Sequence, residues 1–500
     1  MEKTPETIDN KIEPVARSGE DDSIVEETKN VFTSDEYALA KLGYKQEFFR
    51  GLGLFENWAA TFTSMNFISG IPVLFGWVMY TGGPTAAFAN WTMIGGLSFI
   101  VSLSMSEIAA ALPTAGGIYY WSYALGGAEW GPFLAWMTGW WNWAGWVSVV
   151  PGVQQGSTNF LISALEIKYP AAEVLAKGWF AWLLTSIGML FAMAPNVVNQ
   201  RVLQWYFRFA VIIFHVLFVL YWIWFPIRAS QTGGFQPGSG VFDHFYNGIN
   251  LGEEKQASDA YCWTISILFG AWVFYGYDAS VHLAEETQEA SEVVAKGMWM
   301  ATLSAWVMSV PTLIIILFCI QDFDGIINGS YANNWAAYLV QLVGENVPIH
   351  AAFLVLAMSV IITTAVIGSV VAFGAITATA TIATNVSYLF PILARQTVGR
   401  KSFTTAKWNL GRFSLPAAVV TGCYISFLVI VLLLPQLYPV TGETLNYAPI
   451  MIGGISIISL VGWWLPFGYG GRSWFKGPQR TISVEEVERG VIIEGLDVKV

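Results

Sequence analysis

Eleven long apolar stretches, separated by shorter polar connections, dominate the pattern of hydrophobic and polar positions along this chain. A helix needs about 20 mostly apolar residues to cross the hydrocarbon core of a bilayer. We expect spans at roughly 54–80, 86–112, 131–153, 177–197, 204–226, 261–284, 298–320, 351–371, 373–394, 414–434 and 447–467. The segment 113–130 is too polar and glycine-rich to span, and we expect a loop leading into a short interfacial helix. The pattern predicts an all-α polytopic membrane protein.

The first apolar stretch is interrupted near its middle by Ser69-Gly70-Ile71-Pro72. A helix in lipid must satisfy its backbone hydrogen bonds internally, so this interruption needs a reason. The best attested reason is a discontinuous helix that binds a solute near the bilayer midplane. The amides of Ser69, Gly70 and Ile71 would then be unpaired donors at the positive end of a half-helix, where a carboxylate is stabilised. The alternative is a Gly-Pro kink without a ligand.

A second break is expected more than 200 residues later, at 275–278, where the acid Asp278 stands inside an apolar stretch. Ionisable residues at membrane depth are expensive and are usually functional or paired. Asp278 is a candidate to hold an ammonium group or to accept a coupling proton. The alternative is a structural partner for His282, four residues on. Phe274 and Tyr277 beside the break are aromatic candidates for contact with a cationic solute.

Charge distribution separates the ends of the chain from its middle. The chain has 500 residues, of which 55% are hydrophobic and 12% charged, with a net charge of −11. A soluble domain usually carries about twice that charged fraction. Much of the acid lies in the first fifty residues and in the tail, so both ends are expected to be disordered. We expect no cleavable signal peptide before the first stretch, and nothing in the basic residues suggests a nucleic-acid partner.

Lys and Arg in short loops predict orientation. Lys41, Lys45 and Arg50 precede the first stretch, so the N-terminus should be cytoplasmic. The most basic loop, 395–412, should also be cytoplasmic, yet it follows the ninth stretch and would lie outside. The conflict disappears if one span is missing between residues 320 and 351.

A comparison of the two halves supports a missing span. Four stretches follow the first break and only three follow the second. Gly70 to Phe225 covers 155 residues and Asp278 to Arg395 covers 117, a shortfall of 38 residues, or about one span and a loop. A skipped exon, a gene-model error and a genuine eleven-span variant are the three possible causes.

Several motifs together resemble those of the fungal amino acid/choline/GABA permeases of the amino acid–polyamine–organocation (APC) superfamily. They are Ser106 to Trp121, Trp130-Gly131-Pro132-Phe133, Thr138-Gly139-Trp140, Ser69-Gly70-Ile71-Pro72 and Tyr277 to Glu286. The similarity covers about residues 45–345 and 348–475. It implies a LeuT-like five-plus-five inverted repeat with two extra helices, here lacking the eighth span, which family members carry between the equivalents of Glu345 and Pro348.

The resemblance implies secondary active transport of amino acids or related amines, such as GABA or choline, by alternating access around broken helices 1 and 6. Proton symport is the usual coupling in this family. The expected division is a disordered acidic cytoplasmic tail (1–50), a permease domain (51–470) and a cytoplasmic C-terminal tail (471–500). Within the domain we expect a first repeat at about 54–226, a second at about 261–395 and the extra helices at about 412–467. The alternative is a non-transporting truncated isoform that acts as a sensor or regulatory partner.

Other polar and aromatic residues are weaker candidates. Among five tryptophans in the third stretch, Trp140 or Trp143 is a candidate for contact with substrate, the alternative being an interfacial anchor or a packing residue. Glu107 is expected to tie down the Gly116-Gly117 turn, the alternative being a proton-relay role. The adjacent acids Glu285 and Glu286 are candidates for a gate or a loop anchor, the alternative being a solvated helix end.

Catalytic and metal-binding patterns do not emerge from the sequence. It holds no nucleophile–base ordering, no H-E-x-x-H and no phosphate-cradling loop, so we expect neither an enzyme nor a cofactor. The three cysteines and four histidines are scattered, and we expect no metal site. The plasma membrane is the expected location, with a vacuolar or other organelle membrane as the alternative.

Overall fold

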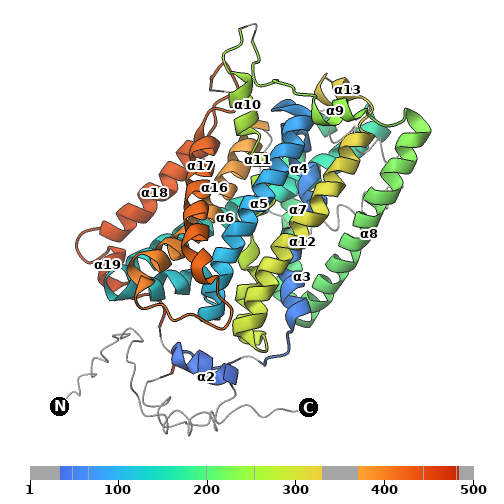
Figure 1. Cartoon of the computed structure of the whole chain (residues 1–500). Helices are drawn as coiled ribbons and strands as arrows, with labels where there is room; N and C mark the ends of the chain where they lie inside the picture. The colour runs from blue at the N-terminus through green and yellow to red at the C-terminus, as the bar shows by residue number, and fades with distance from the viewer. Residues whose placement is uncertain are drawn as a thin grey trace, which may run out of the picture.

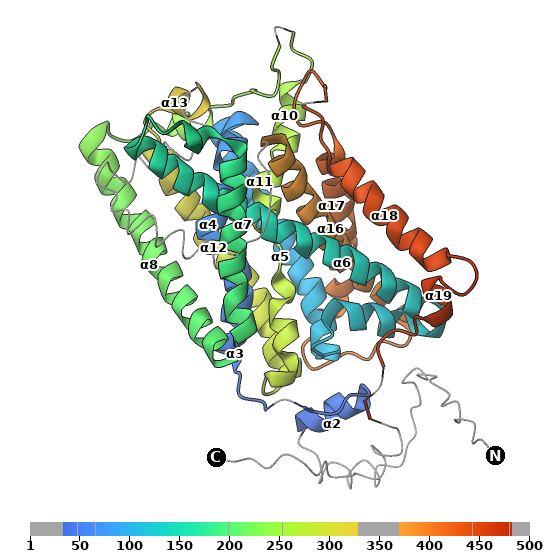
Figure 2. The ribbon, with the colours of Figure 1, turned by 180° about the vertical axis from the view of Figure 1, so that it is seen from behind.

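The computed structural model describes residues 34–328 and 370–482, apart from the single positions 48, 66, 199, 253, 443 and 480. The regular elements in this part of the chain are helices, joined by loops that hold three isolated β-bridges. Figures 1 and 2 show the long helices side by side in one bundle, with the short helix α2 beneath one end. The expectation of an all-α membrane protein is confirmed.

In the first half of the bundle, the structure describes the 3₁₀ helix η1 (Glu173–Ala176) and seven α-helices. The α-helices are α2 (Ser34–Lys41), α3 (Leu54–Ser64), α4 (Phe67–Tyr80), α5 (Gly83–Ala111), α6 (Gly117–Lys168), α7 (Gly178–Val198) and α8 (Gln200–Thr232). The helix α6 contains a kink at Gly127, whose φ of 65° and ψ of −167° are non-helical. A positive φ of this kind favours glycine. The short helix before the kink agrees with the expectation for 113–130.

The second half of the described chain begins with short helices and continues with longer ones. They are α9 (Gly238–Phe242), α10 (Asp259–Ile265), α11 (Leu268–Ala271), the 3₁₀ helix η2 (Tyr277–Glu286), α12 (Ala290–Cys319), α13 (Phe323–Asn328), α16 (Val370–Gln396), α17 (Ser414–Leu433), α18 (Ala448–Trp464) and α19 (Gly471–Trp474). The expected stretch 351–371 lies outside the described residues except for its last two positions. By length and hydropathy, six segments within the described ranges 34–328 and 370–482 qualify as spans, so the count of eleven stays a prediction.

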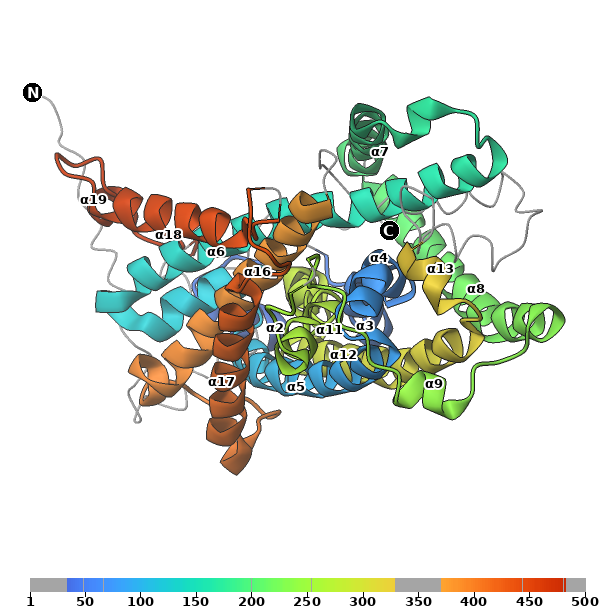
Figure 3. The same ribbon diagram turned by 90° about the horizontal axis from the view of Figure 1, so that it is seen from above.

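The two broken helices cross the bundle side by side and in opposite directions. The first half of one, α3, packs against η2, while its second half, α4, packs against α11. Because α3 precedes α4 and α11 precedes η2, this pairing requires antiparallel chains. An inverted repeat produces such an arrangement. Next to them α6 crosses α16 (Figure 3), and Gly145 of α6 packs directly on Thr384 of α16.

Basic loops gather at one end of the bundle, called the basic end below. Arg50 donates to the carbonyl of Thr287 at 2.6 Å, and the Lys407 ammonium lies 3.2 Å from Glu292, near the start of α12. Arg395 lies 3.8 Å from Glu107 at the end of α5. The expectation that these loops share one side is confirmed, while the identity of that side as cytoplasmic stays a prediction.

The helices that flank residues 329–369 meet that segment at the same end of the bundle. The helix α12 starts at the basic end and finishes at the opposite end, where the Phe318 carbonyl accepts from Gln236. The helix α16 starts near Gln436 at that opposite end and returns to the basic end at Arg395. A connection between two points on one side of a bilayer crosses it an even number of times. The sequence between them offers one apolar stretch, which supports the missing span.

Candidate functional site

The first break lies earlier than the sequence suggested. The helix α3 ends at Ser64, the backbone of Met65 is non-helical (φ −90°, ψ 41°), and α4 begins at Phe67. The first-turn amides of α4 therefore belong to Phe67, Ile68 and Ser69. The prediction that Gly70 and Ile71 also head the half-helix needs correction, because both follow that turn. Sequence reasoning placed the break at the Gly-Pro pair, but the helix absorbs that pair.

Pro72 sits inside α4 rather than in its first turn. Proline has no amide hydrogen, so the carbonyl four residues earlier, at Ile68, lacks its usual donor. The hydroxyl of Tyr221 on α8 donates to that oxygen at 3.5 Å. A side chain from another helix thus takes over part of the missing backbone bond, which explains how α4 tolerates the proline.

Gly70 lies against the second broken helix. It is buried, and a Cβ at this position would lie 2.5 Å from Cγ2 of Val273. The glycine therefore allows the backbones of the two broken helices to approach closely. Close packing is therefore the role that the structure gives Gly70.

The second break falls at the expected place. Gly276 has a φ of 84°, in the left-handed region, and η2 begins directly after it. The hydroxyl of Tyr388 on α16 accepts from the Gly276 amide at 3.1 Å and donates to Oδ1 of Asp278 at 2.7 Å. Tyr388 thus holds the break and the acid together. This partner lies 110 residues from Asp278 in the chain, and no local pattern identifies it.

Asp278 is fully buried and already has partners within the chain. Its second oxygen, Oδ2, lies 3.6 Å from Nε2 of His282, and the exposed side-chain fractions are 1% for Asp278 and 48% for His282. At that distance the two groups form an ion pair only when the imidazole is protonated. The alternative role, a structural partner for His282, is therefore present in the structure. It leaves the substrate and coupling roles as proposals.

The two breaks meet beside α6. A Cβ at Gly276 would lie 3.4 Å from Cβ of Ser64 and 3.7 Å from Cη2 of Trp146. Trp146 is the tryptophan that the structure places at the break, and sequence reasoning did not select it. The ring of Trp140 instead lies 5.9 Å from that of Trp136 and 5.8 Å from that of Trp143, on another face of α6. A contact of Trp140 with substrate stays a prediction.

The aromatic residues of the second break point into the packed core. The ring of Phe274 lies 5.1 Å from Trp91 of α5, and the ring of Tyr277 lies 5.0 Å from Tyr388. The buried hydroxyl of Tyr277 has no hydrogen-bond partner in the part of the chain that the structure describes. Tyr277 is thus the better placed of the two for a polar contact.

At the basic end η2 holds the loop before α6. Oε1 of Glu285 accepts from the Ala115 amide at 3.1 Å, and Nδ1 of His282 lies 3.1 Å from the Ala115 carbonyl oxygen. A Cβ at Gly117, whose φ is 53°, would lie 3.3 Å from the His282 ring. The neighbouring Gly116 is the N-cap of α6. Glu285 therefore anchors the turn of these two glycines.

Glu107 has different partners from those expected. Its carboxylate accepts from the Leu410 amide at 3.4 Å and from the Ser414 hydroxyl, and it lies 3.8 Å from Arg395. Glu107 thus ties α5 to the ends of α16 and α17. The prediction that it holds the Gly116-Gly117 turn was wrong, because that turn packs on η2. The structural role predicted for Glu107 is present.

The segment before α3 closes the basic end from below. The amides of Gly51 and Leu52 both donate to the Glu286 carbonyl at 3.0 Å. Arg50 donates to the carbonyls of Ala284 at 3.0 Å and Thr287 at 2.6 Å. Burial lowers the pKa of the Arg50 guanidinium from its usual value. These bonds join the start of the first broken helix to the end of the second.

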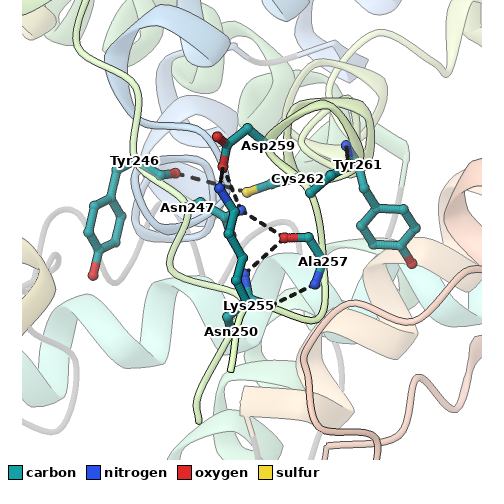
Figure 4. A network of polar contacts seen from close by, with 9 residues as sticks. Tyr246, Asn247, Asn250, Lys255, Ala257, Asp259, Tyr261 and Cys262 are labelled. Carbon is teal, nitrogen blue, oxygen red and sulfur yellow. Dashed lines mark hydrogen bonds and ion pairs between the residues drawn. The ribbon is translucent and has the colours of Figure 1, made fainter. Parts of the chain in front are cut away.

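At the opposite end a folded loop holds the start of the second broken helix (Figure 4). Asn247 donates to Asp259 at 2.9 Å, Asn250 donates to the Ala257 carbonyl at 3.1 Å, and Lys255 lies 2.8 Å from Asp259. Hydrogen bonds from Lys255 and Asn247 hold the pKa of the Asp259 carboxyl below its usual value. The residues that the structure describes include no cluster suited to a metal ion.

Comparison with known proteins gives consistent matches. The sequence model of the amino acid permease family matches residues 55–347. The thiamine transporter thi9 of Schizosaccharomyces pombe is 26% identical over 86% of this chain and 85% of its own. The amino-acid permease BAT1 homolog of Oryza sativa subsp. japonica is 29% identical over 88% of this chain and 94% of its own. The amino-acid permease BAT1 of Arabidopsis thaliana is 26% identical over 90% of this chain and 97% of its own.

Two further details come from these comparisons. The alignment with thi9 spans 503 positions but includes 86% of this 500-residue chain, about 430 residues, so about 70 positions have no counterpart here. A solved manganese transporter of Eremococcus coleocola covers 89% of this chain and 98% of its own, at 10% identity and a TM-score of 0.42. The family match ends at residue 347, where the missing span is expected.

Proposed function

The chain belongs to the amino acid permease family, and from that premise we propose that it moves amino acids or related amines across a membrane by alternating access around its two broken helices. It is an integral membrane transporter and not an enzyme. GABA and choline are candidate substrates. Thiamine joins them because a relative at 26% identity bears the name of a thiamine transporter. These solutes share a cationic nitrogen.

The observation that carries the proposal is the meeting of both breaks beside a buried acid. The first-turn amides of Phe67 and Ile68 on α4 offer donors to a carboxylate, and Asp278 supplies a negative charge two residues after Gly276 of the second break. An amino acid or GABA carries both matching groups, whereas choline and thiamine carry only the cation. Because Asp278 is bonded to Tyr388, binding of a cation there requires that this pair rearrange or share the carboxylate.

The bonds at the basic end support a gate. Arg50, Gly51 and Leu52 are bound to the last turn of η2, and we infer that these bonds close the path from the breaks toward this end. Alternating access requires that such a closure form and break in turn. We propose that these bonds part when the site opens toward the basic end, and that protons drive the cycle.

A second function has a specific observation in its favour. Because α12 ends and α16 begins at the same end of the bundle, the chain between them must cross the membrane an even number of times. The sequence there supplies one apolar stretch. A chain without its eighth span is a candidate for a non-transporting sensor or regulatory partner. We place it second because the helices around both breaks are complete and packed.

Uptake measurements separate the two functions. Cells that express this chain would be given labelled amino acids, GABA, choline and thiamine, beside cells with a form carrying a family eighth span inserted after Glu345. Uptake by this chain supports the transporter, and uptake by the extended form alone supports the non-transporting alternative. No uptake by either form argues against the proposed substrates. A fluorescent fusion would show whether the plasma membrane or an organelle membrane holds the protein.

A further inference from the structure

The inner half of the second broken helix is an unusually long 3₁₀ helix. η2 covers ten residues, Tyr277–Glu286, whereas 3₁₀ segments rarely exceed three or four residues and often mark functional hinges. With three residues per turn, side chains three apart share a face. Asp278, Val281 and Ala284 form the buried face, and all three are fully buried. His282 and Glu285 form a neighbouring face, which contacts Ala115.

Three side chains on two helices link the second break to the basic end. Tyr388 bonds both the Gly276 amide and Oδ1 of Asp278, and Oδ2 of Asp278 lies 3.6 Å from Nε2 of His282. The other ring nitrogen of His282, Nδ1, lies 3.1 Å from the Ala115 carbonyl oxygen. Because 1% of the Asp278 side chain is exposed, Asp278 cannot exchange protons with water directly. His282 can, because 48% of its side chain is exposed.

We propose that His282 transfers protons between Asp278 and water at the basic end, and that the loop carbonyl of Ala115 blocks this transfer while the end is closed. The proposal rests on the proposed proton-coupled transport and adds the residue that moves the proton. It also explains why an acid at full burial lies beside a half-exposed histidine. In the closed state the carbonyl of Ala115 fixes Nδ1 as the hydrogen-bond donor, so Nε2 presents its lone pair to Asp278.

The proton balance of the transfer is simple. A protonated Asp278 gives its Oδ2 proton to Nε2 of His282, which leaves a carboxylate and an imidazolium. When the loop separates from η2, the imidazolium releases the Nδ1 proton to water and becomes neutral again. One proton has then moved from Asp278 to the basic end. In the open state Nε2 gives a proton to water while Nδ1 takes one up, which restores the first tautomer with no net change in protons, because the ring is half exposed.

The groups around His282 leave Asp278 as its charged partner. In the described part of the chain its electrostatic partners are Asp278 on its own helix and the Ala115 carbonyl of the facing loop. Glu285, on the same face of η2, is bound to the Ala115 amide. Tyr44 and Arg50 of the segment before α3 interact with Glu285. Burial, aided by Glu285, raises the pKa of Tyr44 to about 12, so Tyr44 stays neutral at ordinary pH.

The test compares two transport modes in proteoliposomes that contain the full chain. His282→Gln keeps a polar side chain of similar size but cannot carry a proton. Labelled amino acids, GABA, choline and thiamine serve as probes in parallel. Net uptake driven by a pH gradient should fall at least about tenfold, while exchange of labelled for unlabelled probe should stay within about twofold, because exchange needs no net proton movement. His244→Gln, at the opposite end, is the control and should change neither mode.

Three results would overturn the proposal. Equal loss of exchange and net uptake in His282→Gln indicates a structural or substrate role. If uptake by the unaltered chain does not depend on the pH gradient, the proposed transport function is retained but proton transfer by His282 is excluded. No uptake or exchange of any probe by the unaltered chain overturns the proposed function and the relay with it.

A measurement without substrate covers the case in which the variant transports poorly. In solubilised protein, the infrared C=O band of protonated Asp278 is the band that disappears in Asp278→Asn. Its pH midpoint should shift in His282→Gln, because the neighbouring imidazole no longer gains charge beside the carboxylate. An unchanged midpoint contradicts the proposal.

Discussion

Gly70 in the first broken helix and Val273 in the second pack so closely that a Cβ on the glycine would lie 2.5 Å from a methyl carbon of the valine. This contact fixes how near the two breaks approach each other. Gly70 lies just after the first-turn amides of α4, and Val273 lies three residues before the left-handed Gly276. The geometry of the whole candidate site therefore depends on the absence of a side chain at position 70.

Enlarging Gly70 should remove transport without preventing membrane insertion. Gly70→Ala forces Val273 to move, and overpacking of this kind destabilises by about 1–3 kcal/mol. Gly70→Leu is larger and should abolish uptake. Uptake of the labelled probes is measured beside surface abundance and melting temperature in detergent. Normal uptake by Gly70→Leu would remove the first-break site from the proposal.

A matched second substitution separates packing from ligand binding. Val273→Ala makes room for the methyl group, so Gly70→Ala with Val273→Ala should regain stability relative to Gly70→Ala alone, by a coupling of about 0.5–3 kcal/mol. If transport returns together with stability, Gly70 acts by packing. If stability returns and transport does not, the approach of a solute to the backbone at this position is needed as well.

Removing the Tyr388 hydroxyl should loosen the second break. Tyr388→Phe leaves the Gly276 amide and one oxygen of Asp278 without their shared partner, and an unsatisfied buried polar group costs about 1–3 kcal/mol. We expect a lower melting temperature and weaker uptake. Tyr424→Phe is the control, because its hydroxyl contacts Ser98 at 3.4 Å and does not reach Asp278. Equal effects of both substitutions would contradict a specific role for Tyr388.

Neutralising Asp278 should change either the substrates or the pH profile. Asp278→Asn keeps a group that accepts from Tyr388 but loses the charge and the exchangeable proton. If Asp278→Asn no longer takes up the cationic probes but its remaining uptake still depends on pH, Asp278 is a substrate ligand. Loss of pH dependence with retained exchange indicates a coupling site. An unchanged pH profile and unchanged substrate preference would leave Asp278 with only its structural role beside His282.

Local sequence signals located both broken helices but not the contacts that surround them. Glycine, proline and a lone acid in apolar stretches are visible in the sequence, and the left-handed Gly276 lies where they indicated. The start of α4 at Phe67 was missed because Pro72 is accommodated by Tyr221, which bonds the Ile68 carbonyl from 153 residues away along the chain. The exchange of roles between Glu107 and Glu285 likewise depends on tertiary packing, as does the position of Trp146 beside Gly276.

Breaking the Arg50 contacts should open the basic end. Arg50→Ala removes the donor to the Ala284 and Thr287 carbonyls, and Arg50→Lys should restore little, because an ammonium lacks the fixed fork of a guanidinium. Opening is followed with Ser64→Cys, placed at the meeting of the breaks, in a chain whose Cys262, Cys319 and Cys423 are replaced by alanine. A thiol reagent from the basic end should label that cysteine faster in Arg50→Ala. An equal labelling rate with and without the Arg50 side chain would show that its bonds do not close the basic end.

The described ends of α12 and α16 imply a further span between them. α12 ends and α16 begins at the same end of the bundle, and the sequence between them offers one apolar stretch. Transcripts with about 40 additional codons near Glu345 are therefore expected, enough for one span and a loop. With that segment the chain between α12 and α16 holds two apolar stretches, and the loop 395–412 returns to the side of the N-terminus. Full-length sequencing of the transcripts is the measurement. If such a transcript exists and only its product transports, this chain is the shorter, non-transporting form. If no such transcript exists and this chain transports, the connection between α12 and α16 does not need an eighth span.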